Sequence, residues 1–142
     1  MEELRLITPI GRERAAEVVH ILRGAWWADT RTLDDVERML LATPVSMGLY
    51  SEKADGLVAF GRALTDGVYK ALLLDVIVAE PYRGHGVGHI LIEALMSHPT
   101  LSAVEDVELF CSPQHVRLYA SFGFSVPRDT VFLRRRLADP RS

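Results

Sequence analysis

Cysteine is nearly absent from this chain of 142 residues, and the single Cys111 has no partner for an internal disulfide bond. No apolar run approaches the roughly 18 to 20 residues that a membrane-spanning helix requires. The opening residues, MEELRLITPI, have neither the basic start nor the apolar stretch of a secretory signal peptide. These absences argue against a disulfide-stapled, membrane-spanning or secreted protein, and we expect a cytoplasmic one.

A strong excess of one charge is also lacking. The formal net charge is −3 at pH 7, and the basic residues form one run, Arg134-Arg135-Arg136. Such a chain has no general attraction to nucleic acid or to an anionic membrane, so we expect neither as a partner. Repeats and linkers are missing too, while 49% hydrophobic and 25% charged residues are ordinary values for a globular protein. We expect a single domain that covers residues 1–142.

The hydrophobic periodicity predicts helices and strands in an order typical of an α/β protein. Apolar residues recur at helical spacing in four segments, the second of which is capped by Thr32 or Asp34. The first, third and fourth predicted helices are 12–23, 87–97 and 113–122, and the second is stopped by Pro44. The predicted strands are 4–7, 45–51, 57–64, 69–78, 104–110 and 130–137. Strand 104–110 should run parallel to 69–78 because a helix carries the chain back. Strand 130–137 should be an edge strand whose arginines oppose aggregation.

A glycine-rich turn follows the buried strand Leu72–Ala79. It reads Arg83-Gly84-His85-Gly86-Val87-Gly88, and a helical pattern begins directly behind it. Glycines allow positive φ and close approach to main-chain N–H groups, and the start of the helix offers unpaired N–H groups and the positive end of its dipole. Arg83 adds a permanent positive charge suited to two phosphate oxygens. The turn therefore predicts a binding site for an anion, most often phosphate. This interpretation is favoured over glycines that only cap the following helix.

The spacing of the glycines excludes two common nucleotide motifs. A P-loop requires Lys and then Ser or Thr after its last glycine, whereas Gly88 is followed by His89-Ile90. A dinucleotide fingerprint requires Gly-x-Gly-x-x-Gly on the first strand of a domain, whereas this turn lies past the middle of the chain and has the wrong spacing.

Arg83, Gly86 and Gly88 do fill the pattern Arg-x-x-Gly-x-Gly, and Leu118-Tyr119-Ala120-Ser121-Phe122-Gly123-Phe124 fills Leu-Tyr-x-x-x-Gly-Phe downstream. With these two motifs in this order, the sequence resembles the GCN5-related N-acetyltransferase (GNAT) family over roughly residues 4–137. The resemblance implies the α/β GNAT fold. That fold is a twisted, mixed but mostly antiparallel sheet of 6–7 strands, flanked by about four helices, with a splayed parallel pair of strands at the cofactor site.

The resemblance also implies the co-substrate and the reaction. Acetyl-coenzyme A would donate an acetyl group to a primary amine of a small molecule or peptide by direct attack, without a metal, and main-chain groups of Val76–Val78 would pair with the pantetheine arm. Many relatives have Asn shortly before the family tyrosine; this chain has Ser112 in that region. The residues expected to bind the cofactor are Val76, Ile77, Val78, Arg83, Gly84, His85, Gly86, Val87, Gly88, His89, Ser112 and Tyr119.

Two residues are the candidates for catalysis. Tyr119 matches the family tyrosine that acts as general acid toward the sulfur of coenzyme A; the alternative is a core tyrosine of an amphipathic helix. Asp75 is a carboxylate inside an apolar strand, where a charge is costly unless it is paired or used. It is expected to be the base, the anchor of the acceptor's ammonium group, or the structural partner of Arg62 or Arg31.

Other titratable groups are weaker candidates. Glu80, His85 and His115 are alternatives for the base. Cys111 invites the hypothesis of a covalent acetyl-enzyme, but the family mostly transfers the group directly, and a spectator thiol is the favoured interpretation.

The stretch Gly24–Thr32 contains adjacent tryptophans. Either one packs inward while the other lines a pocket, or both are core residues beneath a loop. In the family this loop often borders the acceptor site. Trp26, Trp27, Arg31 and Asp75 are therefore the expected substrate-binding residues, which would suit an aromatic or carboxylate-bearing amine.

Two other classes of protein stay open on the sequence alone. One is a catalytically silent sensor or regulatory module that binds acyl-coenzyme A, which would need neither Tyr119 nor Asp75. The other is a scaffold that binds no nucleotide. A homodimer is a further expectation, since dimers are common in the family.

Overall fold

The computed structural model describes residues 2–138 of the chain, which divides into two compact units. The first unit runs to Leu109 and the second begins at Phe110. The expectation of one domain over residues 1–142 stays a prediction.

The first unit contains a five-stranded sheet in the order β1-β2-β3-β4-β5. Its strands are β1 (Arg5–Ile7), β2 (Val45–Ser51), β3 (Gly56–Thr65), β4 (Lys70–Val78) and β5 (Asp106–Glu108). The pairs β1–β2, β2–β3 and β3–β4 are antiparallel, and β5 runs parallel to β4. The predicted mixed, mostly antiparallel sheet and its parallel pair are confirmed.

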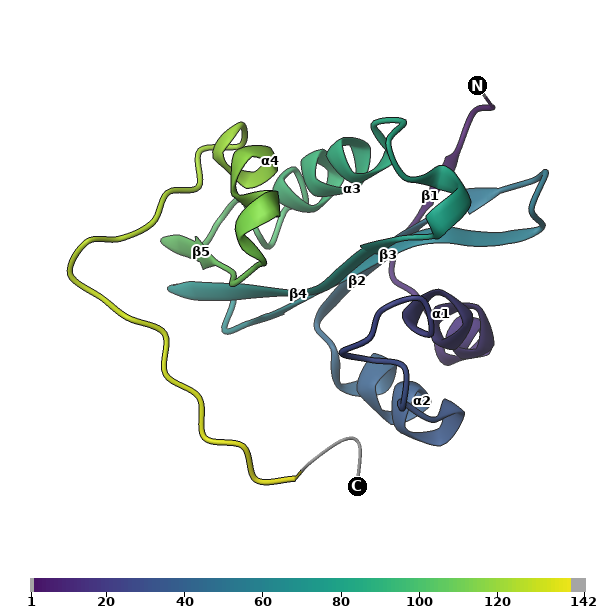
Figure 1. Ribbon diagram of the computed structural model, residues 1–142, viewed down its shortest axis with the longest axis horizontal. Coiled ribbons are helices and arrows are strands. Elements are labelled where there is room, and N and C mark those ends of the chain that lie inside the picture. Colours follow the sequence, from purple (N-terminus) through teal and green to yellow (C-terminus); the bar gives the residue numbers. More distant parts are fainter. Residues whose placement is uncertain (1, 139–142) are drawn as a thin grey trace. The chain divides into compact units, whose positions relative to one another are not determined.

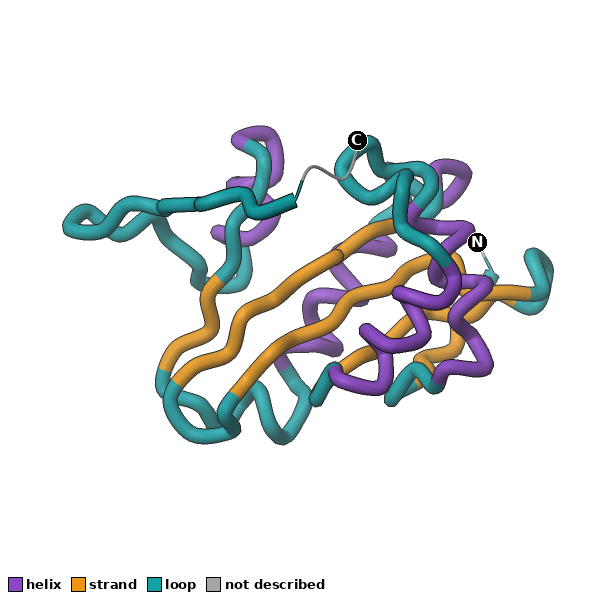
Figure 2. Tube along the Cα trace, turned by 90° about the horizontal axis from the view of Figure 1, so that it is seen from below, coloured by secondary structure: helices purple, strands orange, loops and turns teal. Residues whose placement is uncertain are grey.

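Helices cover both faces of this sheet. The short helix η1 (Arg12–Arg14) precedes α1 (Ala15–Leu22) and α2 (Leu33–Ala42), whereas η2 (Glu80–Tyr82) precedes α3 (Val87–Met96). Figure 1 shows α1 and α2 on one face and α3 on the other, and Figure 2 shows α1 and α2 lying across the strands. No helix within residues 2–138 is both long and apolar enough to cross a bilayer.

The core lies where apolar faces of the helices meet the central strands. Phe60 on β3 and Ile77 on β4 pack with Val18, Leu22 and Val36 from α1 and α2, and all five are buried. Helix α2 begins at Thr32, whose side chain accepts a hydrogen bond from the N–H of Asp35 at 3.2 Å. The predicted cap at Thr32 is confirmed, and such a cap stabilises a helix by about 1 kcal/mol.

Strand β4 carries a β-bulge. Phe60 pairs with Ile77 and Arg62 pairs with Leu74, so β4 has one more residue than β3 across this interval. Asp75 lies in the bulge with φ of 55°, a left-handed conformation that is uncommon for residues other than glycine. Bulges bend a strand and re-aim its side chains. The bulge therefore decides where the Asp75 carboxylate points.

The outer edge of β4 is only partly paired. β5 contacts β4 at Lys70, Ala71 and Leu72, and its pairing ends there. Within the described part of the chain, the edge of β4 beyond Leu72 has no neighbouring strand on this side. This edge of β4 is therefore free of strand partners in the first unit, and the predicted splay of the two parallel strands stays a prediction.

The second unit contains η3 (Pro113–His115) and α4 (Val116–Ala120). The chain leaves α4 through Gly123, which has φ of 91°, and the N–H of Phe124 donates to the carbonyl of Tyr119 at 3.2 Å. This is the kind of glycine termination that the sequence predicted. With α4 the helices number four among residues 2–138, as expected.

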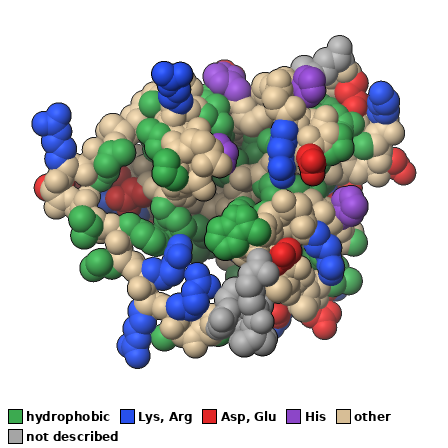
Figure 3. All heavy atoms as spheres, in the orientation of Figure 1, with side chains coloured by type: hydrophobic (Ala, Val, Ile, Leu, Met, Phe, Trp, Pro, Cys, Tyr) green, Lys and Arg blue, Asp and Glu red, His purple; other side chains and the backbone are tan. Residues whose placement is uncertain are grey.

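The predicted strand 130–137 is wrong. This segment forms no regular strand, so the sheet has five strands in residues 2–138 rather than the expected 6–7. A strand exists through hydrogen bonds to a neighbour, and the described part of the chain supplies none here. Val131 and Leu133 are 82% and 85% exposed, and the Arg134 guanidinium lies over the ring of Phe132. Figure 3 shows hydrophobic side chains and side chains of Lys or Arg uncovered on the face of the molecule that it displays.

Candidate active site

The glycine-rich turn joins η2 to α3. Gly84 and Gly86 have φ of 79° and 81°, and Gly86 is the residue before the first turn of α3. A side-chain carbon added at either glycine would meet no atom within 4 Å, so the space beside the turn is open. The first N–H groups of a helix have no acceptor within the helix. This combination fits a diphosphate, and Gly88, Val87 and His89 follow as the first residues of α3.

Arg83 is held at the end of the open edge of β4. The Ala79 N–H donates to the Val58 carbonyl at 2.8 Å, which directs the Val78 carbonyl of the same trans peptide away from β3. The Nε of Arg83 donates to that Val78 carbonyl at 2.9 Å. Within residues 2–138 its terminal nitrogens make no hydrogen bond, so they remain available to an anion.

The unpaired edge at Val76–Val78 offers main-chain groups to a ligand. The side chain of Ile77 is buried against α1 and α2, while Val76 and Val78 are half-buried. An extended ligand arm can add to such an edge as a further strand would. The edge therefore fits a pantetheine arm, with Arg83 and the glycine turn at its end.

Asp75 lies between two arginines. Its Oδ2 accepts from Arg31 Nη1 at 2.8 Å and from Arg62 Nε at 2.7 Å, and its side chain is 5% exposed. Burial would raise the pKa of this carboxyl, but hydrogen bonds and charges from Arg31 and then Arg62 outweigh it and hold the pKa below its usual value. Both of the proposed structural partners are therefore engaged at once.

The two tryptophans are exposed. Trp26 is 75% and Trp27 40% exposed, so neither packs inward, and both the alternative of one inward tryptophan and that of two core residues are wrong. The Arg31 guanidinium lies 5.6 Å from the centre of the Trp27 ring, a cation–π contact. A side-chain carbon added at Gly24 would lie 3.7 Å from the Arg83 guanidinium. The loop from Gly24 to Arg31 thus starts beside Arg83 and ends at Asp75.

Tyr119 and its neighbours belong to the second unit. Partial burial, with a smaller effect of the neighbouring Cys111, raises the pKa of Tyr119 to about 12, so the phenol stays protonated near neutral pH. The ring of Phe124 packs edge-on against it at 5.8 Å. Partial burial also raises the pKa of Cys111, which disfavours the thiolate that a covalent route needs. Ser112 is exposed and precedes η3.

The weaker candidates for the base are surface residues. Glu80, His85 and His115 are exposed. His89 lies 4.0 Å from Glu93, one turn along α3. No group of three or more His, Cys, Asp or Glu side chains suited to a metal ion occurs within residues 2–138.

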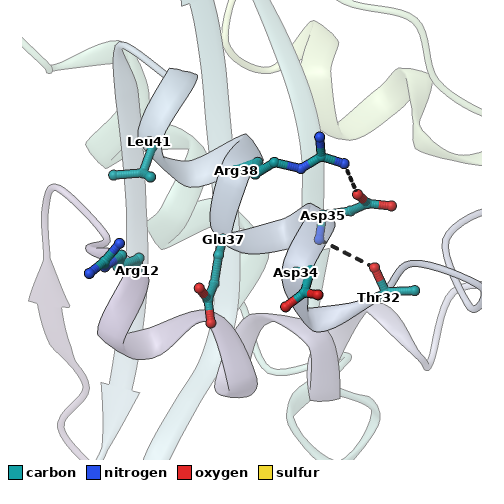
Figure 4. Close-up of a pocket in the computed structure, with 7 residues that line it drawn as sticks. All are labelled: Arg12, Thr32, Asp34, Asp35, Glu37, Arg38 and Leu41. Atoms are coloured by element: carbon teal, nitrogen blue, oxygen red, sulfur yellow. Dashed lines mark hydrogen bonds and ion pairs between the residues drawn. The ribbon is translucent and has the colours of Figure 1, made fainter.

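An open, charged pocket lies between η1 and α2 (Figure 4), and none of its lining residues is among the predicted site residues. Its lining residues are Arg12, Thr32, Asp34, Asp35, Glu37, Arg38 and Leu41. Figure 4 shows Arg38 paired with Asp35, and the Asp35 N–H bonded to Thr32. Such pairs between neighbouring turns are usual on an exposed helix surface.

Sequence reasoning missed the bulge and the proximity of Gly24 to the Arg83 guanidinium. The signal for the bulge was weak: a carboxylate at Asp75 inside an apolar strand, with Gly61 on the strand before it. At Gly61 an added side-chain carbon would come within 3.0 Å of Leu95 on α3. The close packing of α3 over this part of the sheet therefore leaves little room for a side chain at position 61.

Comparisons with known proteins agree with this geometry. Residues 47–126 match the family model described as an acetyltransferase (GNAT) domain. The chain is 33% identical over 81 residues to serotonin N-acetyltransferase 2, chloroplastic, of Oryza sativa, covering 57% of this chain and 40% of the relative. It is 29% identical over 105 residues to GCN5-related N-acetyltransferase 1, chloroplastic, of Arabidopsis thaliana, covering 71% and 53%. The chain thus spans about half the length, or less, of these relatives.

Solved structures give the same answer for the fold. A GNAT-family protein from Xanthomonas campestris pv. campestris superposes with a TM-score of 0.82 at 27% identity, covering 96% of this chain and 95% of that one. Glucosamine-6-phosphate N-acetyltransferase from Arabidopsis thaliana superposes with a TM-score of 0.79 at 17% identity, covering 96% and 100%, a likeness of fold alone. By its sequence motifs, its mixed sheet with a parallel β4–β5 pair and the family model that it matches, the chain belongs to the GNAT family of acetyltransferases.

Proposed function

We propose that this chain transfers an acetyl group from acetyl-coenzyme A to a primary amine. The amine nitrogen forms the new bond to the acetyl carbon, the carbon–sulfur bond breaks, the amine loses a proton and the leaving thiolate gains one. The observation that carries the proposal is the unpaired edge of β4 at Val76–Val78, which ends beside Arg83 and the open glycine turn.

Each part of this arrangement has one task. Arg83 and the N–H groups at the start of α3 bind the diphosphate. Main-chain groups of Val76–Val78 orient the pantetheine arm, and a main-chain N–H on this edge stabilises the oxyanion that develops. Acetyl-coenzyme A, when bound, supplies the acetyl group as an activated thioester. Tyr119 is the proposed general acid, because its raised pKa keeps the hydroxyl available as a donor.

We assign Asp75 to positioning rather than to proton abstraction. A carboxylate that accepts hydrogen bonds from two guanidinium groups, and whose pKa is lowered, is a weak base. Its Oδ2 accepts from both Arg31 and Arg62, and the carboxylate thereby holds these two side chains in place. The proton of the amine then leaves through water, and Asp75 as the base is the competing assignment.

Replacing Asp75 by asparagine separates these two roles. Asparagine tolerates the left-handed backbone at this position but brings no charge, so both arginines lose their common partner. We expect the KM of the acceptor to rise about tenfold, kcat to fall less, and the free energy of unfolding to drop by about 1–3 kcal/mol. Steady-state kinetics over a pH range measure this. A sharp fall in kcat at unchanged acceptor KM, with loss of the acidic limb of the pH profile, would instead identify Asp75 as the base.

The nature of the acceptor follows from the exposed aromatic loop. The rice relative is named for serotonin, an arylalkylamine, and Trp26 and Trp27 beside the site support an aromatic acceptor here. A small molecule is favoured, and a peptide amine stays the alternative. A cytoplasmic location and a homodimer also stay predictions.

The proposal is tested with the full chain in two measurements. Coenzyme A should raise the melting temperature, since a ligand at a hundred times its Kd stabilises the folded state by about 2.7 kcal/mol. Acetyl-coenzyme A with a panel of primary amines should release free thiol in an amine-dependent way. Stabilisation without amine-dependent thiol release would favour the regulatory module, and the absence of both would leave only the scaffold.

A further inference from the structure

We propose that the acceptor amine carries a carboxylate beside an aromatic body, and that Arg31 binds the carboxylate while Trp27 packs against the ring. This inference rests on the proposed acetyl transfer and specifies its substrate class. The chemistry is that of an aromatic amino acid rather than of a simple arylalkylamine.

The charges around Asp75 do not cancel. One carboxylate faces two guanidinium groups, and an excess positive charge remains. Of the three side chains, Asp75 is 5% and Arg62 13% exposed, whereas Arg31 is 31% exposed. The excess charge therefore reaches solvent at Arg31, which is where an anionic group of a ligand would meet it.

Arg31 is also oriented for such a group. Its Nη1 donates to Asp75 and lies 4.0 Å from the sulfur of Met39. Within residues 2–138 its Nε and Nη2 make no hydrogen bond, and these two atoms form the fork that binds a carboxylate with two parallel bonds. The contact with Trp27 and the bond to the buried Asp75 hold the guanidinium in one orientation, which lowers the entropic cost of binding.

The position of this fork fits an acceptor. Arg31 bonds to Asp75, which directly precedes the unpaired main-chain segment Val76–Val78. The loop that carries Arg31 begins at Gly24 beside Arg83. A carboxylate bound at Arg31 and an amine directed at the thioester would thus lie next to the same short stretch of β4. An acceptor with an ammonium group alone would meet the excess positive charge uncompensated.

Matched pairs of acceptors test the inference. Tryptophan and tryptamine differ by one carboxylate, and so do phenylalanine and phenethylamine. We expect kcat/KM to be about 10-fold to 100-fold higher for the acid of each pair, the range of a charge-assisted hydrogen bond. Equal use of both members, or a preference for the amines, would overturn the inference.

Variants of Arg31 connect the preference to this side chain. Arg31→Gln should reduce the acid-to-amine ratio of kcat/KM at least tenfold, and Arg31→Lys should restore part of it because the charge returns without the fork. Arg38→Gln, an exposed arginine of α2, is the matched control and should leave the ratio unchanged. A ratio that is the same in Arg31→Gln as in the parent protein would contradict the assignment.

The failure of the proposed function is distinguishable from that of this inference. If no amine releases thiol, the proposed acetyl transfer is wrong. Binding of the acceptors without turnover then tests whether Arg31 recognises a carboxylate. Titration calorimetry with protein saturated with coenzyme A should then detect tryptophan but not tryptamine, and Arg31→Gln should remove the signal. Equal heats from both ligands, or none from either, would overturn it.

Discussion

Arg83→Glu is expected to lower the affinity for coenzyme A by at least 100-fold. The substitution removes the guanidinium that is held beside the glycine turn and places a carboxylate against the diphosphate, so a charge-assisted bond is replaced by repulsion. Calorimetry with coenzyme A measures the loss, and thermal stabilisation by the ligand should disappear with it.

Two controls make this result specific. Arg38→Glu changes the net charge by the same amount on α2, across the sheet from α3 (Figure 1), and should leave the affinity within a few-fold. Pantetheine lacks the diphosphate, so its weak binding should be insensitive to Arg83→Glu. Unchanged affinity of the Arg83 variant for coenzyme A would remove the anion site from the proposed function.

Tyr119→Phe is expected to lower kcat by about 10²–10⁴-fold while the affinity for coenzyme A is retained. The change removes only the hydroxyl, which partial burial keeps protonated, and leaves the ring in contact with Phe124. Because the pKa of this phenol is about 12, its ionisation should not reduce the rate of the parent protein until the pH approaches that value.

Tyr82→Phe is the matched control for this loss. The Tyr82 hydroxyl bonds to Ser51 and Glu2 in the first unit, and its removal should affect stability more than turnover. If Tyr119→Phe kept at least half of the parent kcat, Tyr119 would be a packing residue of α4, and the general acid would have to be another group.

The sequence predicted most elements of the first unit because local pattern and burial agree there. The predicted strand 45–51 coincides with β2, and the predicted helix 87–97 differs from α3 by one residue. Thr32 caps α2 as its residue type suggested. In these segments the residues that set the periodicity are also the residues that pack in the core. Their secondary structure can therefore be predicted from a single sequence.

Segment 130–137 shows where this reasoning stops. Its apolar and arginine residues have the composition of an edge strand, yet strand formation depends on a partner that the local pattern does not specify. The exposure of Trp26 and Trp27 was missed for a related reason. Large aromatic side chains are usually buried, and a loop that leaves them exposed has no periodicity to reveal it.

The candidate site was predictable in its residue types but not in its geometry. Glycines and Arg83 indicated an anion site directly, and the pairing of Asp75 with Arg31 or Arg62 was among the alternatives. That both arginines bind one carboxylate oxygen follows from the bulge in β4, because the bulge re-aims Asp75. One additional residue in a strand changes which side chains meet while leaving the composition of the strand ordinary.

Position 75 must meet two separate requirements, a left-handed backbone conformation and a negative charge. Asparagine and glycine tolerate φ of 55° but are uncharged, whereas glutamate is charged but adopts this conformation poorly. In a library of all amino acids at position 75, selection for folded protein should therefore enrich a different set of codons from selection for growth that depends on the acetylated product. The difference between the two enrichments would separate the requirement for a bend from the requirement for a charge.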